Sequence, residues 1–141
     1  MTVLLVCLVS AAYMAGLSWF VGVVHYPLFA GVGTDGWAAY HRRHSDRTTL
    51  VVLPPMVAEL VTAGWLVVDR PAGVGAGLAV AGVGLAAATW VATAVAARLH
   101  GTLGETLDVA RHRTLLAVHH ARTALWSAHT LVAALMIGAA T

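Results

Sequence analysis

The sequence predicts an all-α integral membrane protein, a bundle of four transmembrane helices in a single domain. Of its 141 residues, 60% are hydrophobic and only 10% are charged, which leaves too few polar side chains to cover a water-exposed surface. The length accommodates four apolar stretches of about 20 residues, enough for each to cross a bilayer. We therefore expect lipid to cover most of the surface, with no room for a separate soluble domain.

The first span is predicted over about residues 2–25, an apolar stretch without a charge. Because it lacks the basic residues that begin a signal peptide, we interpret it as a retained helix. Pro27 and the glycines after it mark its end. Segment 35–46 carries apolar residues on one side of a helix with arginines nearby, which predicts a short interfacial helix along the membrane surface.

The remaining spans are predicted over about residues 48–68, 74–98 and 110–137. The second contains Pro54-Pro55, which a membrane helix tolerates as a kink where neighbouring groups satisfy the freed carbonyls. The third is rich in Gly, Ala and Thr, small residues that let membrane helices approach closely. It can pack within the bundle or against another copy, so the sequence leaves a homo-oligomer open.

The arginines set the predicted orientation in the cell membrane. All eight basic residues are arginine, and the positive-inside rule makes the loops that hold most of them cytoplasmic, near Arg42 and Glu105, with both termini outside. The opposite side holds only Arg70. No arginine stripe runs beside aromatic residues, so nucleic-acid binding is not expected. The arginines in or beside the two cytoplasmic loops are Arg42, Arg43, Arg47, Arg98, Arg111 and Arg113.

Cys7 is the only cysteine, so neither an intrachain disulfide nor a CxxC zinc site can form. The eight histidines are the more informative residues. On the fourth span, His112 and His119 lie seven residues apart and share a face with Thr123 and Trp126. His119 is therefore expected to point into the bundle, about 10 Å below the interface. The predicted topology gathers five histidines at the cytoplasmic end: His25, His41, His44, His100 and His112.

Glu59 falls near the middle of the second predicted span. A carboxylate there costs about 2–3 kcal/mol or more unless it is protonated, paired or bound to a metal. His119, Arg122 or a metal ion are the candidate partners, and a structural ion pair with Arg122 is the alternative to metal binding.

Neutral imidazoles together with a carboxylate suit iron, copper or zinc, and facing helices of four-helix bundles commonly supply such ligands. The alternative is that His41 and His44 are solvated interfacial residues and that the others form interhelical hydrogen bonds. His120 and His129 are expected to be structural. The predicted metal ligands are His25, Glu59, His100, His112 and His119, followed by His41 and His44.

Several short motifs resemble those of a group of small uncharacterised bacterial four-helix membrane proteins. They are His25-Tyr26-Pro27-Leu28-Phe29, Tyr40-His41, Arg47-Thr48, Pro54-Pro55-Met56, Glu59-Leu60, and Arg122-Thr123 with Trp126. The chain is also distantly similar to the anthrone-oxygenase-like membrane proteins in size and number of spans. That second resemblance implies oxygen-dependent oxidation of a lipophilic small molecule, often in specialised metabolism.

The sequence thus predicts a membrane-embedded, oxygen-using oxidoreductase that holds non-haem iron or copper at its cytoplasmic end. Arg122 or Thr123 would position a lipophilic substrate or a bound oxygen species, and the metal would supply the redox chemistry that side chains lack. Two alternatives stay open. One is a b-type haem electron carrier with two axial histidines. The other is a metal-free proton or ion conduit through Glu59 and His119.

Overall fold

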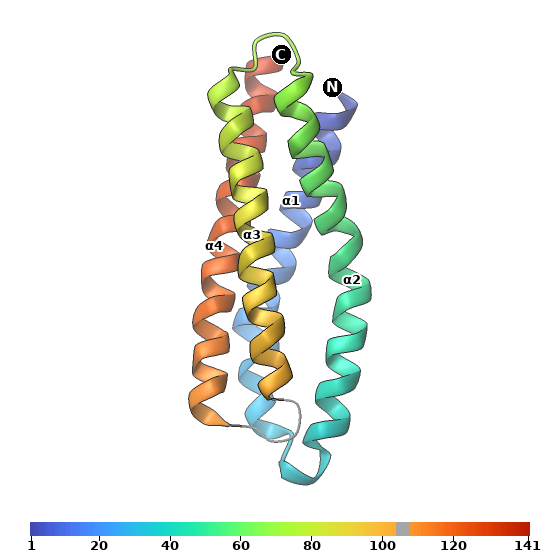
Figure 1. Cartoon of the computed structure of the whole chain (residues 1–141), viewed down its shortest axis with the longest axis vertical. Coiled ribbons are helices and arrows are strands. Elements are labelled where there is room, and N and C mark those ends of the chain that lie inside the picture. The colour runs from blue at the N-terminus through green and yellow to red at the C-terminus, as the bar shows by residue number, and fades with distance from the viewer. Residues whose placement is uncertain (104–107) are drawn as a thin grey trace.

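The computed structural model describes residues 1–103 and 108–141, and within these residues the secondary structure is entirely helical (Figure 1). Glu105, at which the predicted cytoplasmic loop was placed, lies outside the described residues. The first helix is followed directly by a π-helical turn and a 3-10 turn. In chain order the elements are α1 (Thr2–Phe20), η1 (Val21–His25), η2 (Pro27–Gly31), α2 (Thr34–Val68), α3 (Ala76–Thr102) and α4 (Val109–Ala140).

All four long helical segments are long and apolar enough to cross a membrane, which confirms the predicted helix number. Large apolar side chains face outward, among them Leu50 at 76% exposure and Val68 at 86%. Such a surface is unstable in water but suits a bilayer, where lipid tails cover it. The chain therefore has the architecture of a multi-pass membrane protein.

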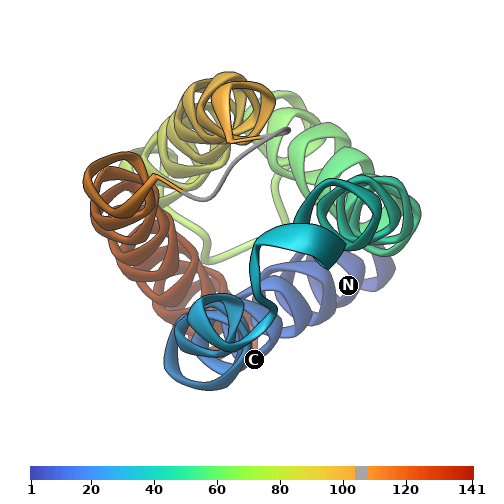
Figure 2. The same ribbon diagram turned by 90° about the horizontal axis from the view of Figure 1, so that it is seen from below.

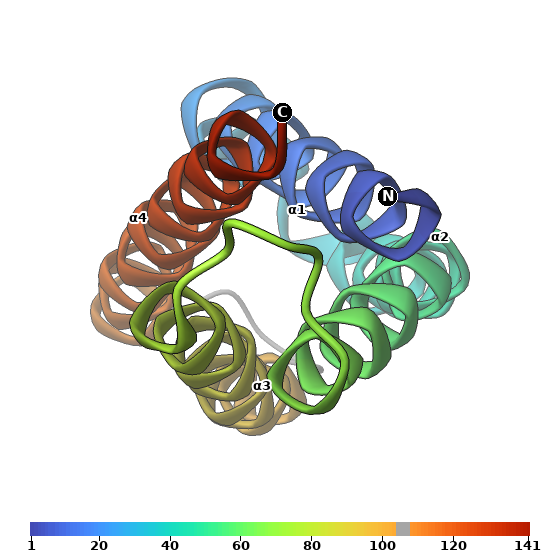
Figure 3. The ribbon, with the colours of Figure 1, turned by 90° about the horizontal axis from the view of Figure 1, so that it is seen from above.

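The four helices stand at the corners of a square when the bundle is viewed along its axis (Figures 2 and 3). Each packs against the next along the chain, and α4 closes the square against α1. Consequently α2 and α4 face each other across the diagonal. Both termini lie at the end of the bundle that carries the α2–α3 loop, and η2 lies at the opposite end (Figure 1).

The predicted separate interfacial helix is wrong. Residues 35–46 are the first turns of α2, which runs for 35 residues, about 52 Å, along the bundle axis (Figure 1). No proline separates this polar stretch from the apolar one, and α2 even continues through Pro54 and Pro55. Trp37 holds these turns in the bundle, since it is fully buried and its indole N–H donates to the Leu103 carbonyl at 2.6 Å.

The end of the first membrane span is shaped by Pro27, which has no N–H to continue the helical ladder. Just before it, the Tyr26 N–H reaches back five residues to the Val21 carbonyl at 2.9 Å, the spacing of a π-helical turn. Within this turn a Cβ on Gly22 would lie 3.1 Å from His119 Cδ2. The bare glycine therefore leaves room for His119 of α4 to pack against α1.

Helix α4 begins at a capping residue outside the apolar span. The Asp108 carboxylate accepts a hydrogen bond from the Arg111 backbone N–H at 2.9 Å, which satisfies a free donor of the first turn. That bond stabilises the ionised form and holds the pKa of the Asp108 carboxyl below its usual value. The cap fixes where the fourth span starts.

Candidate functional site

Four of the predicted histidines lie together at the end of the bundle near η2. His25 Nε2 lies 2.9 Å from His44 Nδ1, and His41 Nε2 lies 3.0 Å from His100 Nδ1. The Tyr26 hydroxyl is 2.9 Å from the other nitrogen of His100. The two pairs are adjacent, since the His44 and His100 ring centroids are 5.7 Å apart. We call His25, Tyr26, His41, His44 and His100 the histidine cluster.

The interpretation of His41 and His44 as solvated interfacial residues is wrong. His41 is only 4% exposed and His44 is half-buried. The continuous α2 directs both toward the bundle axis, where Trp37 packs on His41 with ring centroids 5.2 Å apart. Phe29 packs against His44 at 5.1 Å. Aromatic packing therefore keeps both α2 imidazoles inside the bundle, whereas a helix on the membrane surface would leave them in water.

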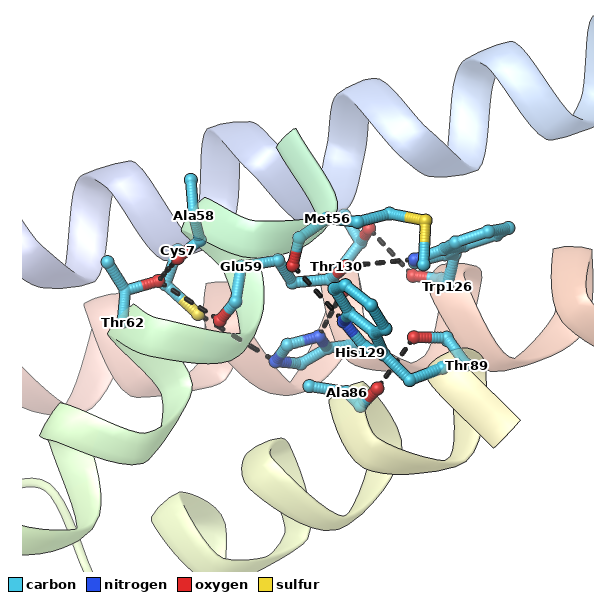
Figure 4. Close-up of polar contacts among 11 residues, drawn as sticks. Cys7, Met56, Ala58, Glu59, Thr62, Ala86, Thr89, Trp126, His129 and Thr130 are labelled. Carbon is cyan, nitrogen blue, oxygen red and sulfur yellow. Dashed lines mark hydrogen bonds and ion pairs between the residues drawn. The ribbon is translucent and has the colours of Figure 1, made fainter. Parts of the chain in front are cut away.

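Glu59 lies in a second cluster of polar side chains, which includes neither His119 nor Arg122, the partners predicted for it. Its Oε1 accepts a hydrogen bond from His129 Nδ1 at 2.5 Å, and its Oε2 accepts one from the Trp126 indole N–H at 2.9 Å (Figure 4). Cys7 Sγ lies 3.7 Å from the remaining His129 nitrogen. All four side chains are fully buried. The expected pairing of Glu59 with His119 or Arg122 is therefore wrong.

The Glu59 network, comprising Cys7, Glu59, Trp126 and His129, is well separated from the histidine cluster. Glu59 and His44 are fifteen residues apart on one uninterrupted helix, which corresponds to about 22 Å along its axis. A metal lies only about 2 Å from each of its ligands. Glu59 therefore cannot share a metal with the histidine cluster, which corrects the predicted ligand set.

The two remaining predicted ligands on α4 point inward but make other contacts. His119 is 3% exposed, and its Nε2 donates to the Ser18 carbonyl at 2.8 Å. The His112 ring stacks on Phe29 at 5.9 Å. Each has one buried ring nitrogen without a partner among the described residues. Thr123, the predicted positioning residue, donates its hydroxyl hydrogen to the His119 carbonyl at 3.0 Å.

Two cavities flank α2 beside the histidine cluster. The one between α1 and α2 measures about 250 Å³, and the one between α2 and α3 about 380 Å³. Arg122 of α4 lines both cavities. Helix α4 lies across the diagonal of the bundle from α2 (Figure 3). The residues that line both cavities are Tyr26, His44, Thr48, Val52 and Arg122.

Within the described part of the chain, no three His, Cys, Asp or Glu side chains are arranged to hold a metal ion. The imidazoles meet in pairs instead. The assignment of iron or copper therefore stays a prediction, as does that of haem.

No family model, curated protein or solved structure matches the chain. The similarity to anthrone-oxygenase-like proteins thus stays a prediction. Because a four-helix bundle hosts many unrelated functions, function has to be argued from the site.

Proposed function

We propose that the protein is a membrane-embedded metal-dependent oxidoreductase that uses oxygen and acts on a lipophilic small molecule. The observation that supports this is the histidine cluster, in which four imidazoles from η1, α2 and α3 lie side by side between two cavities. Imidazole nitrogen is a preferred ligand of iron and copper. When bound, such a metal would supply the one-electron and dioxygen chemistry.

The two histidine pairs would hold the metal, each presenting two imidazole nitrogens. The His25–His44 and His41–His100 nitrogens are 2.9 and 3.0 Å apart. The Thr48 hydroxyl lies 3.3 Å from His44 Nδ1, and the Tyr26 hydroxyl contacts the opposite ring nitrogen of His100. Rotation of these side chains would be needed to bring a third ligand to either pair.

The surrounding residues would hold the substrate and keep water away. Leu17, Phe20 and Val51 line the cavity between α1 and α2, so an apolar molecule can reach the imidazoles from the lipid. Arg122 lines the same cavity and would position the substrate. Thr123 supports the α4 turn through its bond to His119, which makes it a positioning residue for that turn.

A haem carrier fits the described geometry less well. A b-type haem would need two histidines whose nitrogens are free to hold it. The nitrogens of each pair are already at hydrogen-bond distance. A proton conduit from His119 to Glu59 must reach His129, ten positions further along α4 and about 15 Å away, past the indole of Trp126.

The metal proposal predicts that the His44→Ala/His100→Ala double variant loses iron or copper, because each substitution removes one nitrogen from one pair. The wild-type protein in non-ionic detergent should contain close to one metal ion or more per chain by elemental analysis. His120→Ala is the control, since His120 is exposed and should not affect metal content. Glu59→Gln should also retain metal, because Glu59 lies in the other network.

Folded wild-type protein without iron or copper would overturn the metal proposal and leave the conduit as the better function. A Soret band in its absorption spectrum would identify haem instead. Equal metal loss in the His120→Ala control would show nonspecific binding to surface histidines.

We also propose that the end of the bundle near η2 and the start of α2, where most of the arginines lie, faces the cytoplasm, as the positive-inside rule predicts. In a Cys7→Ala background, a cysteine at Asp35 should be protected from an impermeant thiol reagent in intact cells. A cysteine at Asp69, at the other end of α2, should be labelled. Both positions are exposed at the two ends of the same helix. The reverse labelling pattern would establish the opposite orientation.

A further inference from the structure

We propose that Arg122 binds the anionic head of an amphipathic, lipid-soluble molecule, a carboxylate or a phosphate carrying an apolar tail. The site consists of the Arg122 guanidinium and the two cavities that it lines. The inference goes beyond the oxidoreductase proposal, because the guanidinium needs an anion whether or not the histidine cluster holds a metal.

Arg122 is a buried cation without a counter-ion among the described residues. Its side chain is 92% buried, since its exposure is 8%, and it makes no hydrogen bond or salt bridge to them. Its Nε is buried and unpartnered. The Trp126 ring lies 4.9 Å from the guanidinium carbon, and an aromatic face compensates only part of the lost hydration.

The arginine cannot escape this cost by losing its proton, because a guanidinium stays charged in proteins. An unpaired charge within the membrane is expensive, and such residues normally face a partner or a functional cavity. Among the described residues the one buried acid is Glu59, and its two oxygens are bonded to His129 and Trp126. No acid in the described part of the chain is bonded to Arg122, so a bound anion would supply the missing counter-charge.

The cavities have the charge that an anion requires. Among the described residues no acid lines either cavity, and the arginines that do are Arg122 and the exposed Arg47. Hydrogen-bond donors stand nearby, including the Thr48 hydroxyl, which lines both cavities. A planar guanidinium with free N–H groups matches the oxygens of a carboxylate or phosphate.

An apolar tail fits the remaining walls of the cavity between α1 and α2. Met14 and Val52 line its inner part, and Phe20 and Val51 stand at its rim. The rim residues are 56% and 46% exposed on the outer surface of the bundle, where lipid lies. A molecule held by its head at Arg122 can therefore extend its tail between α1 and α2 toward the bilayer.

The test measures binding rather than turnover, on chelator-treated protein in non-ionic detergent, so that its result does not depend on a metal. Oleate and dodecyl phosphate should raise the melting temperature of the wild-type protein, whereas oleyl alcohol, which lacks the charge, should not. Arg122→Gln should weaken oleate binding at least about tenfold, because a charge-assisted hydrogen bond is lost. Arg122→Lys should retain part of the binding. Arg43→Gln, which removes an exposed arginine outside both cavities, is the charge-matched control.

The ligand-free variants give a second, independent readout. If the guanidinium has no protein partner, Arg122→Gln should melt at a temperature equal to or higher than that of the ligand-free wild type. A lower melting temperature together with unchanged oleate binding would assign Arg122 a structural role with Trp126 and overturn the proposal. Stabilisation by inorganic phosphate but not by oleate or dodecyl phosphate would exclude a tailed ligand and also overturn it.

Discussion

Replacing His129 by leucine is expected to destabilise the protein by about 3–5 kcal/mol, the cost of removing one partner of a buried charged pair. The substitution leaves Glu59 fully buried with Trp126 as its remaining hydrogen-bond donor. Water cannot reach the freed carboxylate oxygen in the membrane interior. Reversible unfolding of the wild-type and variant proteins in mixed micelles measures the difference.

The matched test is the double variant Glu59→Gln/His129→Leu, which removes the charge together with its partner. We expect it to recover at least half of the lost stability, because a neutral amide costs less to bury than a carboxylate. His120→Leu, at an exposed position of the same helix, should leave stability nearly unchanged. A double variant as unstable as His129→Leu alone would show that packing around His129, rather than its bond to Glu59, stabilises the bundle.

Gly73→Ala is the second substitution for which a large effect is expected. Gly73 lies in the α2–α3 loop with a φ of +86°, and a Cβ there would overlap the Ala139 carbonyl oxygen of α4. A left-handed conformation for a residue with a side chain costs about 1–3 kcal/mol, and the overlap with backbone adds to it. We therefore expect a lower melting temperature and a displaced C-terminal turn of α4.

Gly75→Ala is the control for this loop. Gly75 has extended backbone with a φ of −67°, and a Cβ there meets nothing within 4 Å. Because Gly75 is the N-cap of α3, where glycine is preferred to alanine, the melting temperature of Gly75→Ala should fall slightly, by much less than that of Gly73→Ala. Equal destabilisation by both substitutions would attribute the effect to the loop sequence in general and contradict the specific contact with Ala139.

The second helix begins at Thr34, well before the predicted start of the second span near residue 48. With the second span starting near residue 48, the sequence predicts Glu59 near the middle of that span, with His119 as one candidate partner. The continuous α2 starts at Thr34, so Glu59 lies twenty-five residues from that end. His129 lies twenty residues into α4, which runs in the same direction, and is therefore the histidine at the level of Glu59.

Hydropathy indicates whether a stretch of residues lies in water or in lipid, but not whether its backbone continues as one helix. A helix that is polar at one end and apolar at the other is therefore predicted as two separate segments. The feature of the sequence that indicates one continuous helix is the absence of any proline between residues 34 and 53. Of the α4 histidines, His129 is the one whose distance from the start of its helix, twenty residues, comes nearest to the twenty-five residues of Glu59. It also shares a helix face with Trp126.

The sequence by itself determined the four membrane helices and the inward face of α4, because hydropathy and helical spacing are local properties that lipid and bundle packing enforce. It also identified four imidazoles that meet at one end. The tertiary structure alone decided which polar groups pair: Glu59 with His129 and Trp126, and His25, His41, His44 and His100 with one another. Pairing depends on helix register and diagonal placement across the bundle, and a register shift of one helical turn moves a side chain by about 5.4 Å, more than the length of any hydrogen bond.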